Sequence, residues 1–150
     1  MDITGIMATS QHRYPFLLID RILELEPGVR SVGVKNVTMN EPYMRGYTPE
    51  HPTVPPVLLV EHAAQIGCVL LLSVPANADK LGMFTGMQEV VFHRAVVPGD
   101  QIVTEVVIER LSSRAGKVRF ASRVDGEVVV DGHFMFLLAP DPAKAVPVEA

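Results

Sequence analysis

The sequence has one cysteine, no cluster of basic residues and no uninterrupted apolar run of membrane-spanning length. Cys68 has no second cysteine with which to form an internal disulfide, and its apolar neighbours predict an inert core thiol in a reducing, cytoplasmic setting. Lys and Arg never form a run longer than two residues and the net charge is −4, so the basic surface of a nucleic-acid-binding protein is missing. We therefore expect no nucleic-acid partner.

The most apolar stretch, residues 57–74, is interrupted by Glu61, His62 and Gln65. Three polar side chains are costly in a lipid bilayer, so we interpret the stretch as a buried helix and expect no membrane span. The first residues show no basic segment followed by an apolar one, so no secretory signal is expected either.

Apolar residues, in contrast, are abundant: 48% of the residues are hydrophobic and only 20% are charged. In a chain of 150 residues this composition predicts one domain with a sizeable core. We place that domain at residues 1–138. Residues 139–150 have no apolar periodicity and carry three prolines, which predicts a loose C-terminal tail.

Local patterns in the first half of the chain predict two strands and one long helix. A strand is expected at 16–22, and alternating residues that include Val32 and Val34 indicate a second. A loop with four prolines then leads to Pro56, which suits the first position of a helix. Because nearly all residues from 57 to 72 are apolar or small, this helix must be covered almost all round.

The second half of the chain reads as an antiparallel meander. Strands are expected at 83–92, 101–111, 117–124 and 127–138, with Asp125-Gly126 as a two-residue hairpin turn. One long helix among five or six strands predicts an α+β fold in which a curved sheet wraps around the helix. The N-terminus of the helix would then lie near the sheet edge, where a second copy of the chain could cover it, so we expect a homodimer or higher oligomer.

Several ordered motifs resemble one known family. They are HRYPFLLIDRI at 12–22, KNVTMNEP at 35–42, GYTPEHPTVPPVLLVEHAAQ at 46–65, VVFHRAVVPGDQ at 91–102 and VDGEVV at 124–129. Together they are similar to the 3-hydroxyacyl-(acyl carrier protein) dehydratases of the FabZ type, which have the hot-dog fold. The resemblance covers nearly the whole chain.

The resemblance implies a site shared by two subunits over an acyl tunnel. In the family motif GHFPxHP followed by PGVxxxExxAQ, the histidine removes the C2 proton and the helix carboxylate, here Glu61, helps to expel the 3-hydroxyl from the other subunit. A backbone N–H at the glycine of PGV polarises the thioester carbonyl. Base, acid and oxyanion donor are what an enolate-like transition state requires. The family chemistry needs no cofactor.

Two positions depart from the family pattern. Tyr47 stands where the family has its histidine, and a phenol, with an ordinary pKa of about 10, is a poor base at neutral pH. Pro56 stands at the oxyanion glycine and has no N–H; the N–H of Val57 could replace it only if the carbonyl shifts. Loss of a base removes roughly 10²–10⁴ in rate, and loss of one oxyanion donor about 10²–10³.

We expect Pro56, Val57, His51, Phe92 and Arg94 to bind the acyl thioester, with Glu61 and Tyr47 at the reacting carbons. His51 or His62 could replace the missing base, although adjacent helical residues diverge, so His62 is expected to face away from Glu61. Arg94 would meet an acidic carrier protein. The histidines show no recognised metal-ligand spacing, and no metal site is expected.

Three functions remain open at this point. The first is a FabZ-like dehydratase acting on a 3-hydroxyacyl thioester of acyl carrier protein or coenzyme A, with weakened or altered activity. The second is a non-catalytic subunit of a heteromeric dehydratase, in which a sibling supplies the histidine. The third is a hot-dog acyl thioesterase in which Glu61 activates water.

Overall fold

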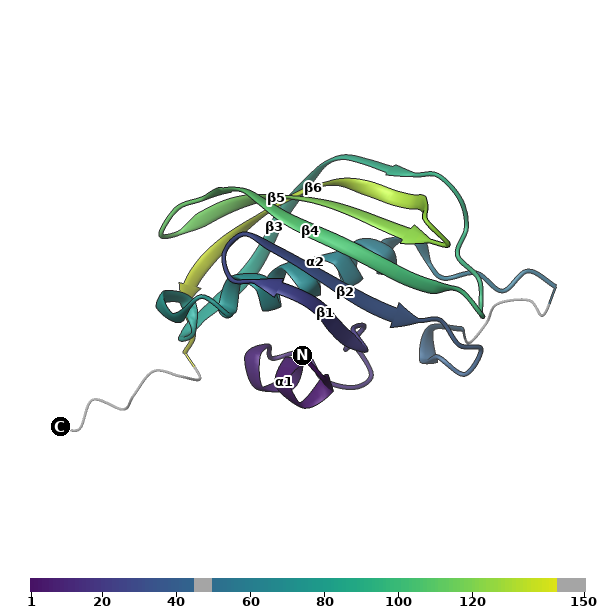
Figure 1. The fold of residues 1–150 in the computed structure, drawn as a ribbon, viewed down its shortest axis with the longest axis horizontal. Coiled ribbons are helices and arrows are strands. Elements are labelled where there is room, and N and C mark those ends of the chain that lie inside the picture. The colour runs from purple at the N-terminus through teal and green to yellow at the C-terminus, as the bar shows by residue number, and fades with distance from the viewer. Residues whose placement is uncertain (45–49, 143–150) are drawn as a thin grey trace.

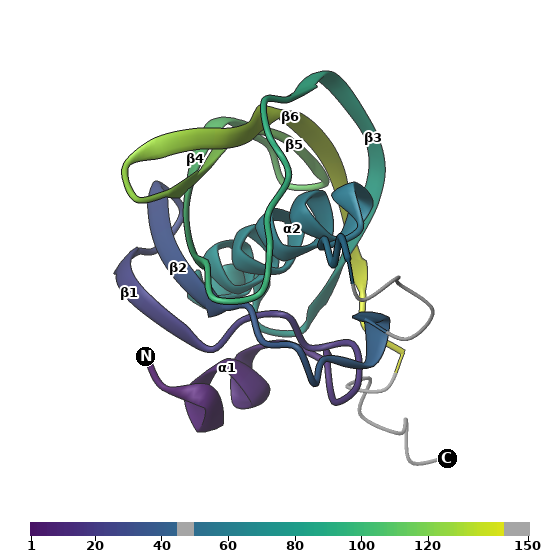
Figure 2. The ribbon, with the colours of Figure 1, turned by 90° about the vertical axis from the view of Figure 1, so that its right-hand side faces the viewer.

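A strongly curved antiparallel sheet packs around one long helix (Figures 1 and 2). The computed structural model describes residues 1–44 and 50–142. The helices are α1 (Ile3–Thr9) and α2 (Pro56–Leu72), and two 3₁₀ segments are η1 (Pro42–Met44) and η2 (Pro75–Asn77). The strands are β1 (Arg21–Glu26), β2 (Arg30–Asn36), β3 (Lys80–Phe92), β4 (Gln101–Leu111), β5 (Ala115–Val124) and β6 (Glu127–Pro140).

The six strands lie in the order β1-β2-β4-β5-β6-β3, and every neighbouring pair is antiparallel. This sheet with its central helix confirms the predicted α+β hot-dog architecture. The sheet curls so far that strands near its two ends lie on opposite sides of α2 (Figure 2). No helix in the described part of the chain is long and apolar enough to cross a membrane.

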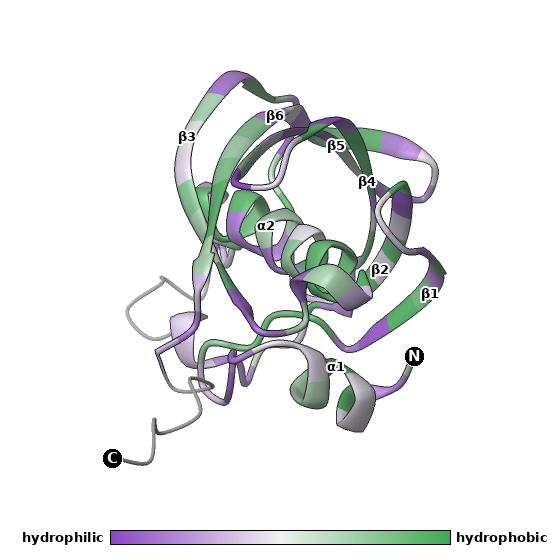
Figure 3. Ribbon diagram, turned by 90° about the vertical axis from the view of Figure 1, so that its left-hand side faces the viewer, coloured by the Kyte–Doolittle hydropathy of each residue, from purple (hydrophilic) through white to green (hydrophobic). Residues whose placement is uncertain are grey.

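Helix α2 has the bounds that the sequence predicts. Pro55 and Pro56 open it, because proline fixes φ near the helical value and the first helical N–H has no partner in the helix in any case. At the other end the N–H of Ser73 still bonds to the Val69 carbonyl, 3.0 Å away, and Pro75 then prevents continuation. In Figure 3 the helix is largely coloured as hydrophobic, in keeping with its position inside the sheet.

The helix packs closely on the sheet at two glycines. A Cβ atom on Gly67 of α2 would lie 2.7 Å from Cζ of Phe134 on β6, and one on Gly33 of β2 would lie 2.5 Å from Cδ1 of Ile66. Ile66 itself is fully buried. Because glycine has no side chain, the helix backbone can approach the strands at these two positions. This close packing fixes the position of the helix face that carries Glu61.

The first predicted strand is wrong in its position. Residues 16–22 were expected to be extended, but β1 begins only at Arg21. Leu18 bonds instead to side chains of α2: its N–H donates to Oε1 of Gln65 at 2.8 Å, and its carbonyl lies 2.8 Å from Nδ1 of His62. A backbone satisfied by helix side chains has no need of a neighbouring strand.

The later strands agree with the sequence pattern. Strand β4 has the predicted bounds, and the Asp125-Gly126 turn joins β5 to β6 with φ of 52° and 86°, the left-handed conformation that two-residue hairpins need. Strand β6 runs to Pro140, two residues into the segment predicted as tail. The rest of that segment beyond residue 142 lies outside the described residues.

Strand β3 is an edge of the sheet and leaves apolar side chains exposed. The exposed fraction is 56% for Met87, 49% for Val91, 46% for Phe84 and 45% for Phe92. A long apolar edge strand is a ready site for pairing with another chain.

Candidate functional site

After its exposed first turn, helix α2 is buried except along one narrow stripe. Glu61, Ala64 and Cys68, spaced three and four residues apart, are only partly buried and so lie on one face of the helix. This stripe forms one wall of a cavity of about 200 Å³. The cavity is lined by His12, Glu61, Ala64, Gln65, Cys68, Leu71, Gly82, Phe84, Phe134 and Phe136.

The lining of this cavity is apolar except at one end. Phenylalanine side chains come from β3 and β6, while the polar groups are Glu61, Gln65 and His12. Such a combination suits a ligand with a hydrocarbon part and one polar functional group. The predicted carboxylate thus lies beside an apolar cavity.

Gln65 holds the carboxylate of Glu61 in place. Its Nε2 donates to Oε1 of Glu61 and to the Phe16 carbonyl, both at 2.8 Å, and its Oε1 accepts from the Leu18 N–H at 2.8 Å. Both amide hydrogens and the amide oxygen are therefore used, and the side chain is 1% exposed. A glutamine fixed in this way restricts the rotamers of its neighbour one turn away on the helix.

His12 is the second titratable group at this end of the cavity. Its Nε2 lies 3.8 Å from Oε1 of Glu61, and its ring packs at a tilt against Phe16. Burial lowers the pKa of His12, an effect that Glu61 opposes and Arg13 reinforces. The imidazole is thus biased toward its neutral form, which can accept a proton.

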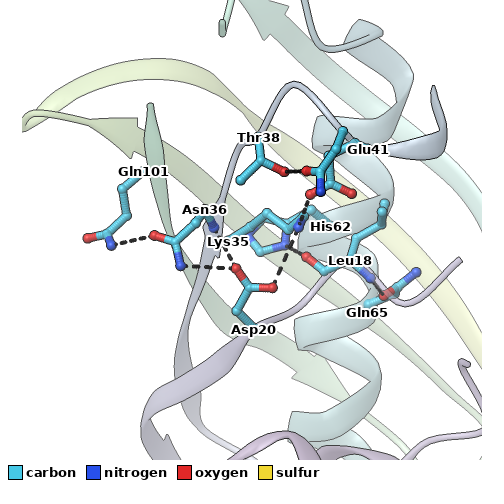
Figure 4. A network of polar contacts seen from close by, with 10 residues as sticks. Leu18, Asp20, Lys35, Asn36, Thr38, Glu41, His62, Gln65 and Gln101 are labelled. Atoms are coloured by element: carbon cyan, nitrogen blue, oxygen red, sulfur yellow. Dashed lines mark hydrogen bonds and ion pairs between the residues drawn. The ribbon is translucent and has the colours of Figure 1, made fainter. Parts of the chain in front are cut away.

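His62 points away from this cavity, as the helical geometry predicts. Figure 4 shows its Nδ1 directed at the Leu18 carbonyl, on the side where Lys35 pairs with Glu41 at 2.5 Å and Asp20 at 3.5 Å. Complete burial lowers the pKa of His62 to about 4. A neutral, inward-facing imidazole is a structural group here, and His62 does not replace the family base.

A second cavity, of about 280 Å³, lies at the N-terminus of α2. It brings together three of the predicted binding residues, Pro56, Phe92 and Arg94. Arg94 donates to the Ala95 carbonyl at 2.8 Å and pairs with Asp100 at 3.4 Å, so part of its charge is already balanced. The proline provides no N–H to this cavity.

Of the remaining predicted residues that the structure describes, Val57 and His51 line neither cavity. Val57 is 64% exposed, and its N–H is the first that the helix offers after two prolines. His51 is exposed and lines neither cavity. Tyr47 lies outside the described residues. Within one chain, therefore, Glu61 is placed in one cavity and the Pro56 position in another.

Comparison with known proteins decides the family. Residues 10–137 match the model of the FabA-like domain. This chain belongs to the FabA-like family. A 3-hydroxyacyl-[acyl-carrier-protein] dehydratase FabZ of Roseiflexus castenholzii is 50% identical over 138 residues, covering 92% of this chain and 96% of the relative. The Geobacillus thermodenitrificans FabZ is 46% identical over 144 residues, covering 96% and 99%. The resemblance seen in the sequence is confirmed.

Solved structures support the same FabA-like architecture at low identity. The dehydratase heterocomplex ApeI:P from Xenorhabdus doucetiae has a TM-score of 0.78 at 17% identity, covering 93% of each chain. A hypothetical thioesterase protein with coenzyme A from Streptococcus pneumoniae has a TM-score of 0.64 at 11% identity, covering 81% of this chain and 86% of that one. These likenesses establish the fold.

Two polar residues that line the Glu61 cavity were given no role in the sequence analysis. Gln65 could have been found from its spacing of four residues from Glu61, which places both on one helix face. His12 opens the motif at 12–22, but nothing in that motif indicates contact with Glu61, which lies 49 positions further along the chain. No group of three or more His, Cys, Asp or Glu side chains within residues 1–44 and 50–142 could hold a metal ion.

Proposed function

We propose that this protein catalyses the reversible elimination of water from 3-hydroxyacyl thioesters, more slowly than relatives that have the family histidine and glycine. The observation that carries the proposal is the position of Glu61 at the polar end of an apolar cavity, where Gln65 orients its carboxylate. An acyl chain would occupy the apolar part, and the 3-hydroxyl would meet the acid. Elimination requires an acid at that oxygen.

The expected slowness follows from the chemistry of Tyr47 and Pro56. A tyrosine cannot remove the C2 proton as readily as an imidazole, and the proline removes one donor to the developing oxyanion. Taken separately, these losses amount to roughly 10²–10⁴ and about 10²–10³. They do not simply multiply, because groups of one site act together.

A second copy of the chain completes the proposed site. Phe84 lines the Glu61 cavity and is nevertheless 46% exposed, so that wall lies open at the edge of the sheet. Pairing of β3 with β3 of another copy would cover Phe84 and bury the exposed Met87 and Phe92 beside it. The homo-oligomer expected from the sequence would in this way close the acyl site.

We consider two carriers for the thioester, acyl carrier protein and coenzyme A. Arg94 contributes one cation to the cavity at the N-terminus of α2, but Asp100 and Glu127 lie 3.4 and 3.8 Å from its guanidinium. This arrangement leaves little net positive charge for an acidic carrier protein. Coenzyme A is also anionic through its phosphates, so this charge does not favour one carrier over the other, and steady-state assays with matched acyl chains will measure which is accepted more readily.

The test of the proposed function is hydration of an enoyl thioester. Wild-type protein should form the 3-hydroxyacyl product, and Glu61→Gln, which keeps the size of the side chain but removes the acid, should lose roughly 10²–10⁴ in kcat. Tyr47→His combined with Pro56→Gly should raise kcat at least tenfold. An inactive wild type, or a Glu61→Gln variant with undiminished activity, contradicts the proposal.

A role as a subunit of a heteromeric dehydratase is the second candidate. One reason is that the chain keeps Glu61 but has Tyr47 and Pro56 where the family has its histidine and glycine. Another is that a dehydratase heterocomplex has the same fold. In that case this protein alone would be inactive, and mixing it with a sibling that has the GHFP histidine would produce activity. Ordinary activity of the purified homo-oligomer rules this candidate out.

A further inference from the structure

One imidazole lies beside the carboxylate of Glu61 in the same chain. Among the histidines of the described residues, only His12 lines the Glu61 cavity. His62 faces the opposite side of α2, and His51 is exposed away from it. His93 pairs with Asp131 at 3.0 Å, and His133 pairs with Glu109 at 3.3 Å.

The geometry directs one ring nitrogen of His12 toward the reacting region. Nε2 lies 3.8 Å from Oε1 of Glu61, while Nδ1 is buried and has no hydrogen-bond partner in the described structure. The distance between Nε2 and Oε1 is longer than a hydrogen bond. A small movement of either side chain would nevertheless bring the two groups close enough to exchange a proton. Glu61 is held from its other side by Gln65.

Resting on the proposed function, we propose that His12 is the base of this enzyme and forms an acid and base pair with Glu61 of its own chain. In the reacting form the carboxyl group of Glu61 is protonated, and His12 is neutral with its Nε2 unprotonated. Nε2 takes the C2 proton of the substrate, and the electrons of that C–H bond form the C2=C3 double bond. The C3–O bond breaks as Glu61 gives its proton to the departing hydroxyl, so that water leaves.

The pair then resets itself without another reactant. After elimination His12 is an imidazolium and Glu61 a carboxylate, and a proton that passes from Nε2 to the carboxylate restores the reacting form. Two charged groups face His12 and have opposite effects on its protonation. Glu61 stabilises the imidazolium, and Arg13 destabilises it. Hydration of an enoyl thioester runs through the same steps in reverse.

This arrangement explains how a chain with tyrosine at the family histidine position can still carry out the reaction. The base would come from the segment before β1, not from the loop before α2. It would also belong to the same chain as the acid, whereas the family arrangement takes the two from different subunits. His12 is therefore a catalytic residue in this proposal, and Gln65 is a positioning residue.

The experiment compares enoyl thioester hydration by wild type, His12→Asn and His133→Asn. His133 lies on β6 next to the buried Phe134, so its side chain points to the other face of the sheet, and it supplies the same chemical change away from the cavity. We expect His12→Asn to lower kcat by roughly 10²–10⁴, with KM within about threefold of wild type. His133→Asn should keep the wild-type kcat.

Two further measurements distinguish a role of His12 as the base from a role in shaping the cavity. Wild-type kcat/KM should fall on the acid side as His12 is protonated, at a pH below the ordinary range of histidine, and this limb should be lost in His12→Asn. Added imidazole should restore at least tenfold activity to His12→Ala and none to Glu61→Gln. If His12 only shapes the cavity, neither result is expected, and its replacement should raise KM instead.

The outcomes distinguish this inference from the function on which it rests. If wild type is active and His12→Asn loses less than tenfold in kcat, the inference is wrong and the proposed function stands. If wild type neither hydrates the enoyl thioester nor dehydrates the hydroxyacyl one, both are wrong. If His12→Asn does not fold, absence of an acid limb in the wild-type profile overturns the inference without any variant.

Discussion

Replacement of Gln65 by leucine tests how tightly the site and the core are connected. The change keeps a similar volume but removes three hydrogen bonds, to the Leu18 N–H, the Phe16 carbonyl and Oε1 of Glu61. Glu61 is partly exposed and can bond to water instead. The Leu18 N–H cannot, because its bond to Gln65 is buried. The bond to the Phe16 carbonyl is only partly buried, so its loss costs less.

The magnitude follows mainly from the orphaned Leu18 N–H. A buried unsatisfied backbone group costs about 1–3 kcal/mol, and the partly buried Phe16 carbonyl adds less, so the variant should lose roughly 1–3 kcal/mol of unfolding free energy after the gain from a more apolar side chain. For a domain of this size each kcal/mol lowers Tm by about 2–4 °C. A loss of about 2 kcal/mol therefore predicts a fall of roughly 4–8 °C.

The assay is urea unfolding at neutral pH, with Gln101→Leu as the matched control. Gln101 is exposed and makes one side-chain hydrogen bond, to Asn36 at 2.8 Å, so its replacement should cost less than about 1 kcal/mol. If Gln65→Leu is no more destabilising than Gln101→Leu, the three contacts do not hold the segment before β1 against α2. The reasoning that links this segment to the site would then be refuted.

Three other changes test separate parts of the structure. Because burial lowers the pKa of His62 to about 4, unfolding frees a group that takes up a proton, so stability should fall as pH drops from about 6.5 to 4; His62→Gln should weaken this pH dependence in unfolding titrations, and an unchanged slope would contradict it. Gly67→Ala should lower unfolding free energy by about 1–3 kcal/mol despite the better helix propensity of alanine, because its Cβ would meet Phe134; a stabilised variant would contradict the close packing. Met87→Lys places a charge on the exposed edge of β3 and should shift the proposed homo-oligomer toward monomer in sedimentation experiments, whereas an unchanged sedimentation coefficient would place the interface elsewhere.

The sequence predicts much of this fold because its signals are local. Two prolines define the start of α2, and the apolar residues that follow leave one interpretation of the segment up to Leu72. Strand β4 is rich in β-branched residues, and Asp125-Gly126 can occupy the left-handed conformation that the hairpin needs. In each case, residues adjacent in the chain contain the information.

The parts that the sequence does not predict depend on contacts between distant residues. Residues 16–20 have the composition of a strand, but Leu18 bonds to Gln65 and His62 of α2. No local pattern reveals that a helix will satisfy this backbone. The same holds for His12, because its approach to Glu61 is a contact between distant parts of the chain.

These contacts give one physical reason for both the packing and the chemistry. Nε2 of Gln65 donates to the Phe16 carbonyl and to Oε1 of Glu61, and Oε1 of Gln65 accepts from the Leu18 N–H, so one amide holds both this backbone and the carboxylate. His12 lies four residues before Phe16 and contacts its ring, so the position of the imidazole depends on the same anchor. Gln65→Leu should consequently change the distance between His12 and Glu61 as well as stability. A variant that still folds but has lost activity as severely as His12→Asn would be the expected result, because proton transfer depends steeply on that distance.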